Sequence, residues 1–209
     1  MAGTWALVGL LGILAVVPSE VEAETVSAEV VSPEAQLAGA LMAAPEDRRE
    51  GATVLGYSES GELITLREGS NELICLADEP GDERFHVSCY HRSLEPYMQR
   101  GRQLKAEGLD GTERLRIRHE EADAGTLEMP STPAGLYNLG GPIAIFDAET
   151  GRVDGGNWVW SIYIPYATEE SSGLPTTPQL PGAPWIMRPG TASSHIMVVQ
   201  PRDPEPEGD

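Results

Sequence analysis

Short runs with a two-residue period fill the chain from residue 52 onward, and they limit the folds open to it. A period of two places alternate side chains on opposite faces, which is typical of β-strands. Turn clusters that contain glycine separate the runs, and such clusters close hairpins. We therefore expect an antiparallel β-meander whose first four strands are residues 52–57, 62–67, 72–77 and 85–90.

Helical patterns interrupt the strands in the middle of the chain. A stripe of residues at helical spacing runs from Leu94 to Leu104, and Gly108 stands where a helix C-terminus favours glycine. Residues 112–124 fit two structures. They alternate as a strand does, but Asp110 opens a capping box, so we favour a helix and keep the strand as the alternative.

Strands return in the last third of the chain. Residues 143–147 and 152–153 flank a hairpin turn, and residues 158–164 are apolar on both faces apart from one serine. The latter pattern predicts a central strand that is covered on both sides. A proline-rich loop over residues 165–190 precedes a short strand, residues 195–199. The whole layout predicts an α+β fold: an antiparallel meander, one or two central helices and a second β region.

The first residues are typical of an export signal. Residues 5–17 form an uncharged apolar run, and Val21 and Ala23 supply the small side chains of a cleavage site. As a helix this run spans about 20 Å, less than the roughly 30 Å of a membrane core. Retention of the segment as an uncleaved anchor is the alternative. We expect a signal peptide (1–23), a leader with a short helix (24–50), a single globular α+β domain (51–200) and a disordered acidic tail (201–209).

The charge of the chain excludes one class of partner. Against 14 Lys and Arg it carries 33 Asp and Glu, which gives a net charge of −19. Such a charge repels nucleic acid and anionic lipid. We therefore expect an exported acidic protein, periplasmic, cell-surface or secreted, that binds no nucleic acid and has no stable membrane insertion after signal cleavage.

The two cysteines, Cys75 and Cys89, fall in neighbouring predicted strands. An even pair in an exported chain is typical of a disulfide, and pairing of the two strands brings the thiols together. A zinc or copper site built from Cys75, Cys89, His91 and His195 is the alternative, although no standard zinc spacing occurs. We expect the disulfide and no cofactor.

Catalytic signals are weak. An exported hydrolase that uses His91 or His195 with a carboxylate is one alternative function. Ser194 precedes His195, but adjacent residues of a strand point apart, so these two do not form a simple nucleophile–base pair. The Gly-x-Ser-x-Gly motif is absent, and no catalytic residue is assigned.

Aromatic residues gather in the C-terminal third. Trp158 and Trp160 share a strand face with Ile162, which is also the pattern of a core, whereas Trp185 lies in the proline-rich loop, where it is placed to cover a pocket. We predict a non-catalytic protein that binds a small ligand or an envelope partner through this region. The candidate binding residues are Trp158, Trp160, Tyr163, Tyr166 and Trp185.

Overall fold

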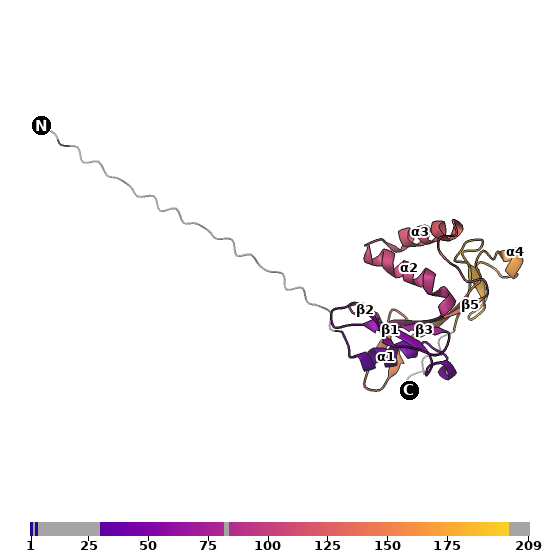
Figure 1. The fold of residues 1–209 in the computed structure, drawn as a ribbon, viewed down its shortest axis with the longest axis horizontal. Helices are drawn as coiled ribbons and strands as arrows, with labels where there is room; N and C mark the ends of the chain where they lie inside the picture. Colours follow the sequence, from indigo (N-terminus) through magenta and orange to yellow (C-terminus); the bar gives the residue numbers. More distant parts are fainter. Residues whose placement is uncertain (2, 4–29, 82–83, 201–209) are drawn as a thin grey trace, which may run out of the picture.

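The computed structural model describes residues 1, 3, 30–81 and 84–200 (Figure 1). The predicted signal peptide, apart from Met1 and Gly3, and the predicted acidic tail lie outside the described residues. Within the described part of the chain, no helix is both long and apolar enough to cross a membrane.

A mixed sheet of eight strands forms the centre of the α+β fold, in the order β2-β1-β3-β4-β5-β8-β10-β9. Neighbouring strands are antiparallel, except that β1 and β3 are parallel. The strands are β1 (Thr53–Tyr57), β2 (Leu63–Arg67), β3 (Leu73–Leu76), β4 (His86–His91), β5 (Ala134–Gly140), β8 (Asn157–Tyr163), β9 (Trp185–Met187) and β10 (His195–Val199).

The first three strands differ from the simple meander that the sequence predicts, because β3 pairs with β1 rather than with β2. Burial explains the order. Leu63 and Ile64 of β2 are exposed, which suits an edge, whereas Leu73 and Cys75 of β3 are buried and need neighbours on both sides. The returning chain passes so close to β1 that a Cβ on Gly69 would lie 2.2 Å from the main-chain nitrogen of Thr53. Glycine is therefore required at this crossing.

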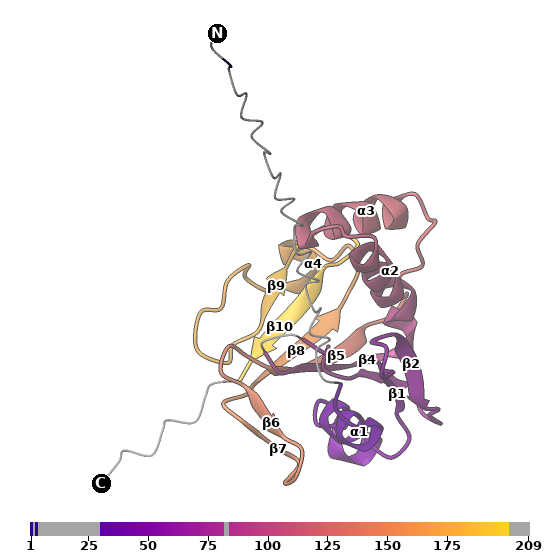
Figure 2. The same ribbon diagram turned by 90° about the vertical axis from the view of Figure 1, so that its left-hand side faces the viewer.

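Helices lie on both faces of the sheet (Figure 2). On one face lie α2 (Glu95–Ala106) and α3 (Gly111–Asp123), joined to β4 by the short η2 (Arg92–Leu94); on the other lies α1 (Pro33–Leu41), followed by η1 (Glu46–Arg48). Residues 112–124 are thus helical, as favoured. Asp110 caps α3, since its Oδ1 accepts hydrogen bonds from the main-chain N–H groups of Thr112 and Glu113. A four-residue helix, α4 (Glu169–Ser172), lies in the proline-rich loop.

The expected hairpin at residues 143–153 is present, but it stands apart from the main sheet. Its strands, β6 (Ile145–Asp147) and β7 (Arg152–Asp154), pair only with each other (Figure 2). Phe146 of β6 reaches back toward the domain and stacks on Phe85 with ring centroids 5.2 Å apart.

Two apolar cores lie on opposite faces of the sheet. The first lies under α1 and includes Ala40, Val54, Cys75 and Cys89, all with no exposed surface. The short helix expected in the leader is therefore packed into the domain. The second core lies under α2 and contains Tyr90, Leu94, Tyr97, Ala134, Leu136 and Tyr163.

The expectation that β8 is covered on both faces is wrong. Ser161 and Tyr163 are buried on the face of α2, but Trp160 and Ile162, on the face of α1, are each 39% exposed. The cause is the reach of α1, which packs against β1, β2, β3 and β4 and leaves β8 uncovered. Figure 2 shows β8, β9 and β10 extending beyond the part of the sheet that α1 covers.

Candidate ligand-binding groove

A groove of about 600 Å³ lies where the cover of α1 ends. Residues 43–46 and Arg49, which follow α1, form one side. Residues 135–137 of β5 and part of β8 form the rest, together with Gln200 directly after β10. We call this hollow the tryptophan groove, after Trp158 and Trp160.

Strand register places the apolar side chains of the groove on one face. Trp160 lies opposite Tyr137 of β5 on one side and opposite Val198 of β10 on the other. Ile162 lies opposite Gly135. Cross-strand partners share a face, so these side chains form a continuous apolar surface. The sequence pattern alone fits both a core and a binding surface.

Gly135 gives the groove its depth. It has no side chain opposite Ile162, and a Cβ built there would fit in ordinary van der Waals contact with the Tyr137 ring, at 3.7 Å from its hydroxyl. Its φ angle is not left-handed, so the backbone does not require glycine at this position. A larger side chain can therefore be placed here to narrow the groove without straining the backbone.

Charged side chains are few along the groove, and Arg49 and Glu46 supply them. The Arg49 guanidinium binds main-chain oxygens at the end of α1: Nε donates to Ala44 at 3.0 Å and Nη2 to Met42 at 3.5 Å. Among the described residues Arg49 forms no ion pair. With few polar side chains, the groove suits a largely apolar ligand better than a sugar, which needs many hydrogen-bond partners.

The remaining candidate aromatic residues lie elsewhere. Tyr163 faces the opposite side of the sheet, stacked on His195 with centroids 4.9 Å apart, and burial raises the pKa of its hydroxyl to about 12. Tyr166 is exposed and donates a hydrogen bond to Asp123. Trp185 lines a separate hollow of about 480 Å³ beside residues 178–182. The structure therefore brings together Trp158 and Trp160 and not the whole predicted set.

The metal site considered as an alternative is not formed. Cys75 and Cys89 are directly opposite in β3 and β4 and are joined by a disulfide, in agreement with the first expectation. His91 accepts a hydrogen bond from the N–H of Ser93 and caps η2. His195 lies on a distant strand, β10, and donates through Nδ1 to the carbonyl of Ser193. The part of the chain that the structure describes contains no group of three or more suitable ligands for a metal ion.

Neither histidine of the hydrolase alternative has a carboxylate among its hydrogen-bond partners in the described residues. A different pair comes closer to a nucleophile and base. His119 of α3 lies with Nε2 2.7 Å from Oγ of Ser193, 74 positions along the chain. Burial is the first cause that lowers the pKa of His119, and the Arg188 charge adds to it. Ser193, however, has no exposed surface, so its hydroxyl is closed to a substrate.

Sequence reasoning missed this contact, because His119 looks like part of a solvated helix face. The contact fastens α3 to the loop that precedes β10, and Asp123, one turn further along α3, binds Tyr166 in the neighbouring loop. Tyr166 and Arg188 are non-glycine residues with positive φ angles, 63° and 52°. Left-handed backbone outside glycine is the signal that marks these loops as tightly constrained.

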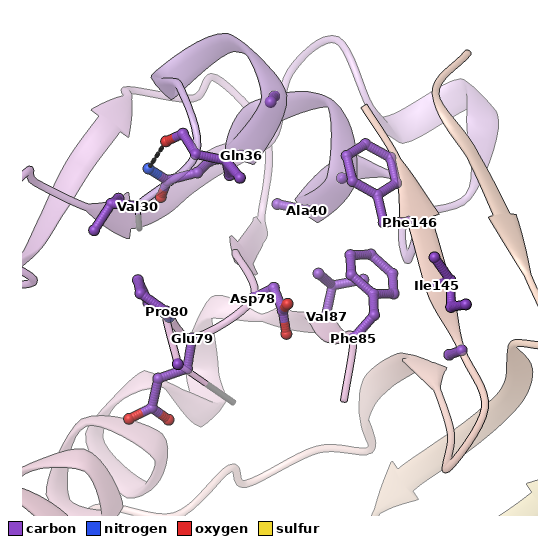
Figure 3. A pocket seen from close by; sticks show the side chains of 15 residues that line it. Val30, Gln36, Ala40, Asp78, Glu79, Pro80, Phe85, Val87, Ile145 and Phe146 are labelled. Atoms are coloured by element: carbon purple, nitrogen blue, oxygen red, sulfur yellow. Dashed lines mark hydrogen bonds between the residues drawn. The ribbon is translucent and has the colours of Figure 1, made fainter. Parts of the chain in front are cut away.

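A smaller hollow of about 350 Å³ lies at the other end of α1 (Figure 3). Phe85 and Phe146 line one side, Asp78 lies beside Phe85 and accepts a hydrogen bond from the N–H of His86, and Glu79 lies farther from the two rings. Glu79 is paired with Lys105, so its charge is already compensated.

Gln36 fixes α1 beside this smaller hollow. Its side-chain amide accepts from the N–H of Tyr57 at 2.7 Å and donates to the carbonyls of Tyr57 and Val31 at 2.9 Å each. These bonds satisfy a buried amide and position the helix. They give Gln36 a structural role.

Comparison with known proteins assigns the chain to no family. No family pattern matches it, and no curated protein or solved structure is significantly similar to it. Its function must therefore be inferred from its own residues.

Proposed function

We propose that this is an exported, non-catalytic binding protein that takes a small, largely apolar ligand into the tryptophan groove. The observation that carries the proposal is the exposure of Trp160 and Ile162, each 39%, in a hollow of about 600 Å³. Small-molecule sites generally measure about 300–1,000 Å³ and are lined mainly by apolar and aromatic side chains.

Packing supports a binding role for these side chains. Across the sheet, the neighbours of Trp160 on both strands are apolar, so the exposed surface is continuous and not a single stray residue. A contiguous exposed apolar surface on a soluble domain is typical of an interaction site. Gly135 adds no side chain to that surface opposite Ile162.

Export is supported by the disulfide between Cys75 and Cys89. Disulfides persist in oxidising compartments and are rare in a reducing cytoplasm. The apolar run and cleavage pattern near the N-terminus favour the same location.

Substitution of Gly135 tests the groove directly. We expect the neutral dye N-phenyl-1-naphthylamine to bind the wild-type protein with increased fluorescence. Gly135→Leu fills the space opposite Ile162, so we expect it to weaken binding at least about tenfold while the fold is kept. Binding in this variant at wild-type strength would disprove the location of the site.

The chain offers a matched control. Gly111 at the start of α3 also has an ordinary φ, and a built Cβ fits there without a clash, 3.7 Å from the Arg114 guanidinium. Gly111→Leu makes the same chemical change away from the groove, and we expect it to bind the dye as the wild type does.

A further inference from the structure

The charge on Arg49 identifies the chemical class of the ligand, an inference that rests on the proposed function. Some arginines of this acidic protein pair with carboxylates: Arg100 with Glu121 at 2.7 Å and Arg102 with Glu95 at 2.5 Å. Arg49 is half-buried beside the groove, and within the described residues its guanidinium hydrogen-bonds only to neutral main-chain oxygens. A partly desolvated cation without an anionic partner gains free energy when an anion binds it.

The guanidinium of Arg49 is also held in place before a ligand arrives. Two of its five N–H donors are used by the carbonyls of Ala44 and Met42, and no other described residue accepts from the remaining donors. A fixed donor fork loses little conformational entropy on binding, which favours a planar, two-oxygen acceptor such as a carboxylate.

A second arginine strengthens the positive field. Nη2 of Arg67 donates to the main-chain carbonyl of Arg49 at 2.5 Å, and Arg67 also binds the carbonyl of Ala52. Like Arg49, it forms no ion pair in the described part of the chain. Arg67 does not line the groove itself, but its guanidinium adds positive charge next to the main chain of Arg49.

Glu46 is the competing charge, because it also lines the groove and would favour a cation. It is exposed, however, and its carboxylate stays hydrated. An exposed carboxylate gains little from an ion pair, whereas the half-buried Arg49 gains more. The balance favours an anionic ligand.

We propose that the tryptophan groove binds a carboxylate with an apolar body, the carboxylate on Arg49 and the apolar part on Trp160 and Ile162. Aromatic acids and fatty acids both have this chemistry. Both kinds of acid would be recognised by the same two elements, the Arg49 guanidinium and the apolar surface of the groove.

Two pairs of probes test the proposal by calorimetric titration. The aromatic pair is 2-naphthylacetate and 2-(2-naphthyl)ethanol, and the aliphatic pair is decanoate and decanol; within each pair only the charge and its oxygens differ. We expect the wild-type protein to bind the carboxylate of at least one pair about tenfold more tightly than its alcohol, as a charge-assisted hydrogen bond predicts. The pair with the tighter carboxylate identifies the source.

Arg49→Gln is the decisive variant. We expect it to remove the preference for the carboxylate while the alcohol binds with unchanged affinity, which shows that the groove is intact. Arg48→Gln is the matched control, since Arg48 is the exposed neighbour, is paired with Asp47 and does not line the groove. We expect this control to keep the wild-type preference.

The outcomes separate the two proposals. Equal binding of carboxylates and alcohols by the wild-type protein, or an unchanged preference in Arg49→Gln, would overturn the role of Arg49 and leave an apolar binding groove. Failure of all four probes and of the neutral dye to bind would overturn the binding function itself.

Discussion

Removal of the disulfide between Cys75 and Cys89 should lower the free energy of unfolding by an amount that the structure allows us to work out. The two cysteines are 14 positions apart and join adjacent strands under α1. Closing a loop of this length in the unfolded chain contributes about 3 kcal/mol on the chain-entropy model. Both residues have no exposed surface, so the substituting side chain also matters.

The double variant Cys75→Ala, Cys89→Ala isolates the loop term most closely, because alanine adds no polar group to the apolar core. We expect a loss of about 3 kcal/mol, with a further loss from the space that the sulfur atoms leave. The double serine variant should be less stable still, since each buried hydroxyl without a partner costs roughly 1–3 kcal/mol.

Urea unfolding of the oxidised and reduced proteins provides the assay. Wild-type protein that is unfolded, reduced and refolded with reductant should lose most of the same stability, and reductant should leave the alanine variant unchanged. The oxidised protein should also show a smaller dependence of stability on urea, because its denatured state is more compact. An intact mass about 2 Da below the free-thiol value confirms the bond before the assay. Equal stability of oxidised and reduced wild-type protein would refute the reasoning.

Two further predictions concern pH and the proline-rich loop. The pKa values of His119 and His195 are both lowered from 6.5, chiefly by burial, so the unfolded chain takes up protons first as the pH falls. The free energy of unfolding should therefore be level above about pH 7 and fall as the pH drops below about 6.5. His119→Gln should reduce that fall. A free energy of unfolding that stays constant down to pH 5 in urea titrations would contradict the burial of the neutral imidazoles. Trp185→Ala should lower the free energy of unfolding by about 1 kcal/mol and leave ligand binding in the tryptophan groove unchanged, because Trp185 lines a different hollow. A decrease of about 3 kcal/mol or more in the free energy of unfolding would show that Trp185 is a core residue.

Local signals in the sequence predicted the local structure. The alternation of β3 and β4 placed Cys75 beside Cys89, and the structure pairs these two residues directly. Asp110 with its capping pattern identified α3, although the same residues also alternate as a strand. In both cases the interaction that determines the structure is local: it joins residues a few positions apart or two strands connected by one turn.

The order of the strands and the exposure of one face of β8 depend on parts of the chain that are distant in sequence. No local sequence pattern predicts them. Eight strands at their usual spacing make a sheet roughly 34 Å wide, whereas one helix is about 10 Å across. The single helix α1 therefore covers only part of one face of the sheet. The side chains of β8 are as apolar as those of a covered strand, so the sequence does not show that this strand is exposed. The short strand β9 was missed because prolines surround it, and the bond between His119 and Ser193 joins residues 74 positions apart.

An exposed apolar face would normally promote association between copies of a protein. The net charge of −19 opposes this association, since two copies repel each other before their faces meet. The same charge also repels a carboxylate in solution, so an anionic ligand needs a local positive field in order to bind. In the proposed complex Arg49, which is held by main-chain carbonyls and forms no ion pair with any described residue, supplies this positive charge at the groove. On the proposed function, global charge and local charge therefore act in opposite directions: the first opposes association between copies, and the second favours an anionic ligand.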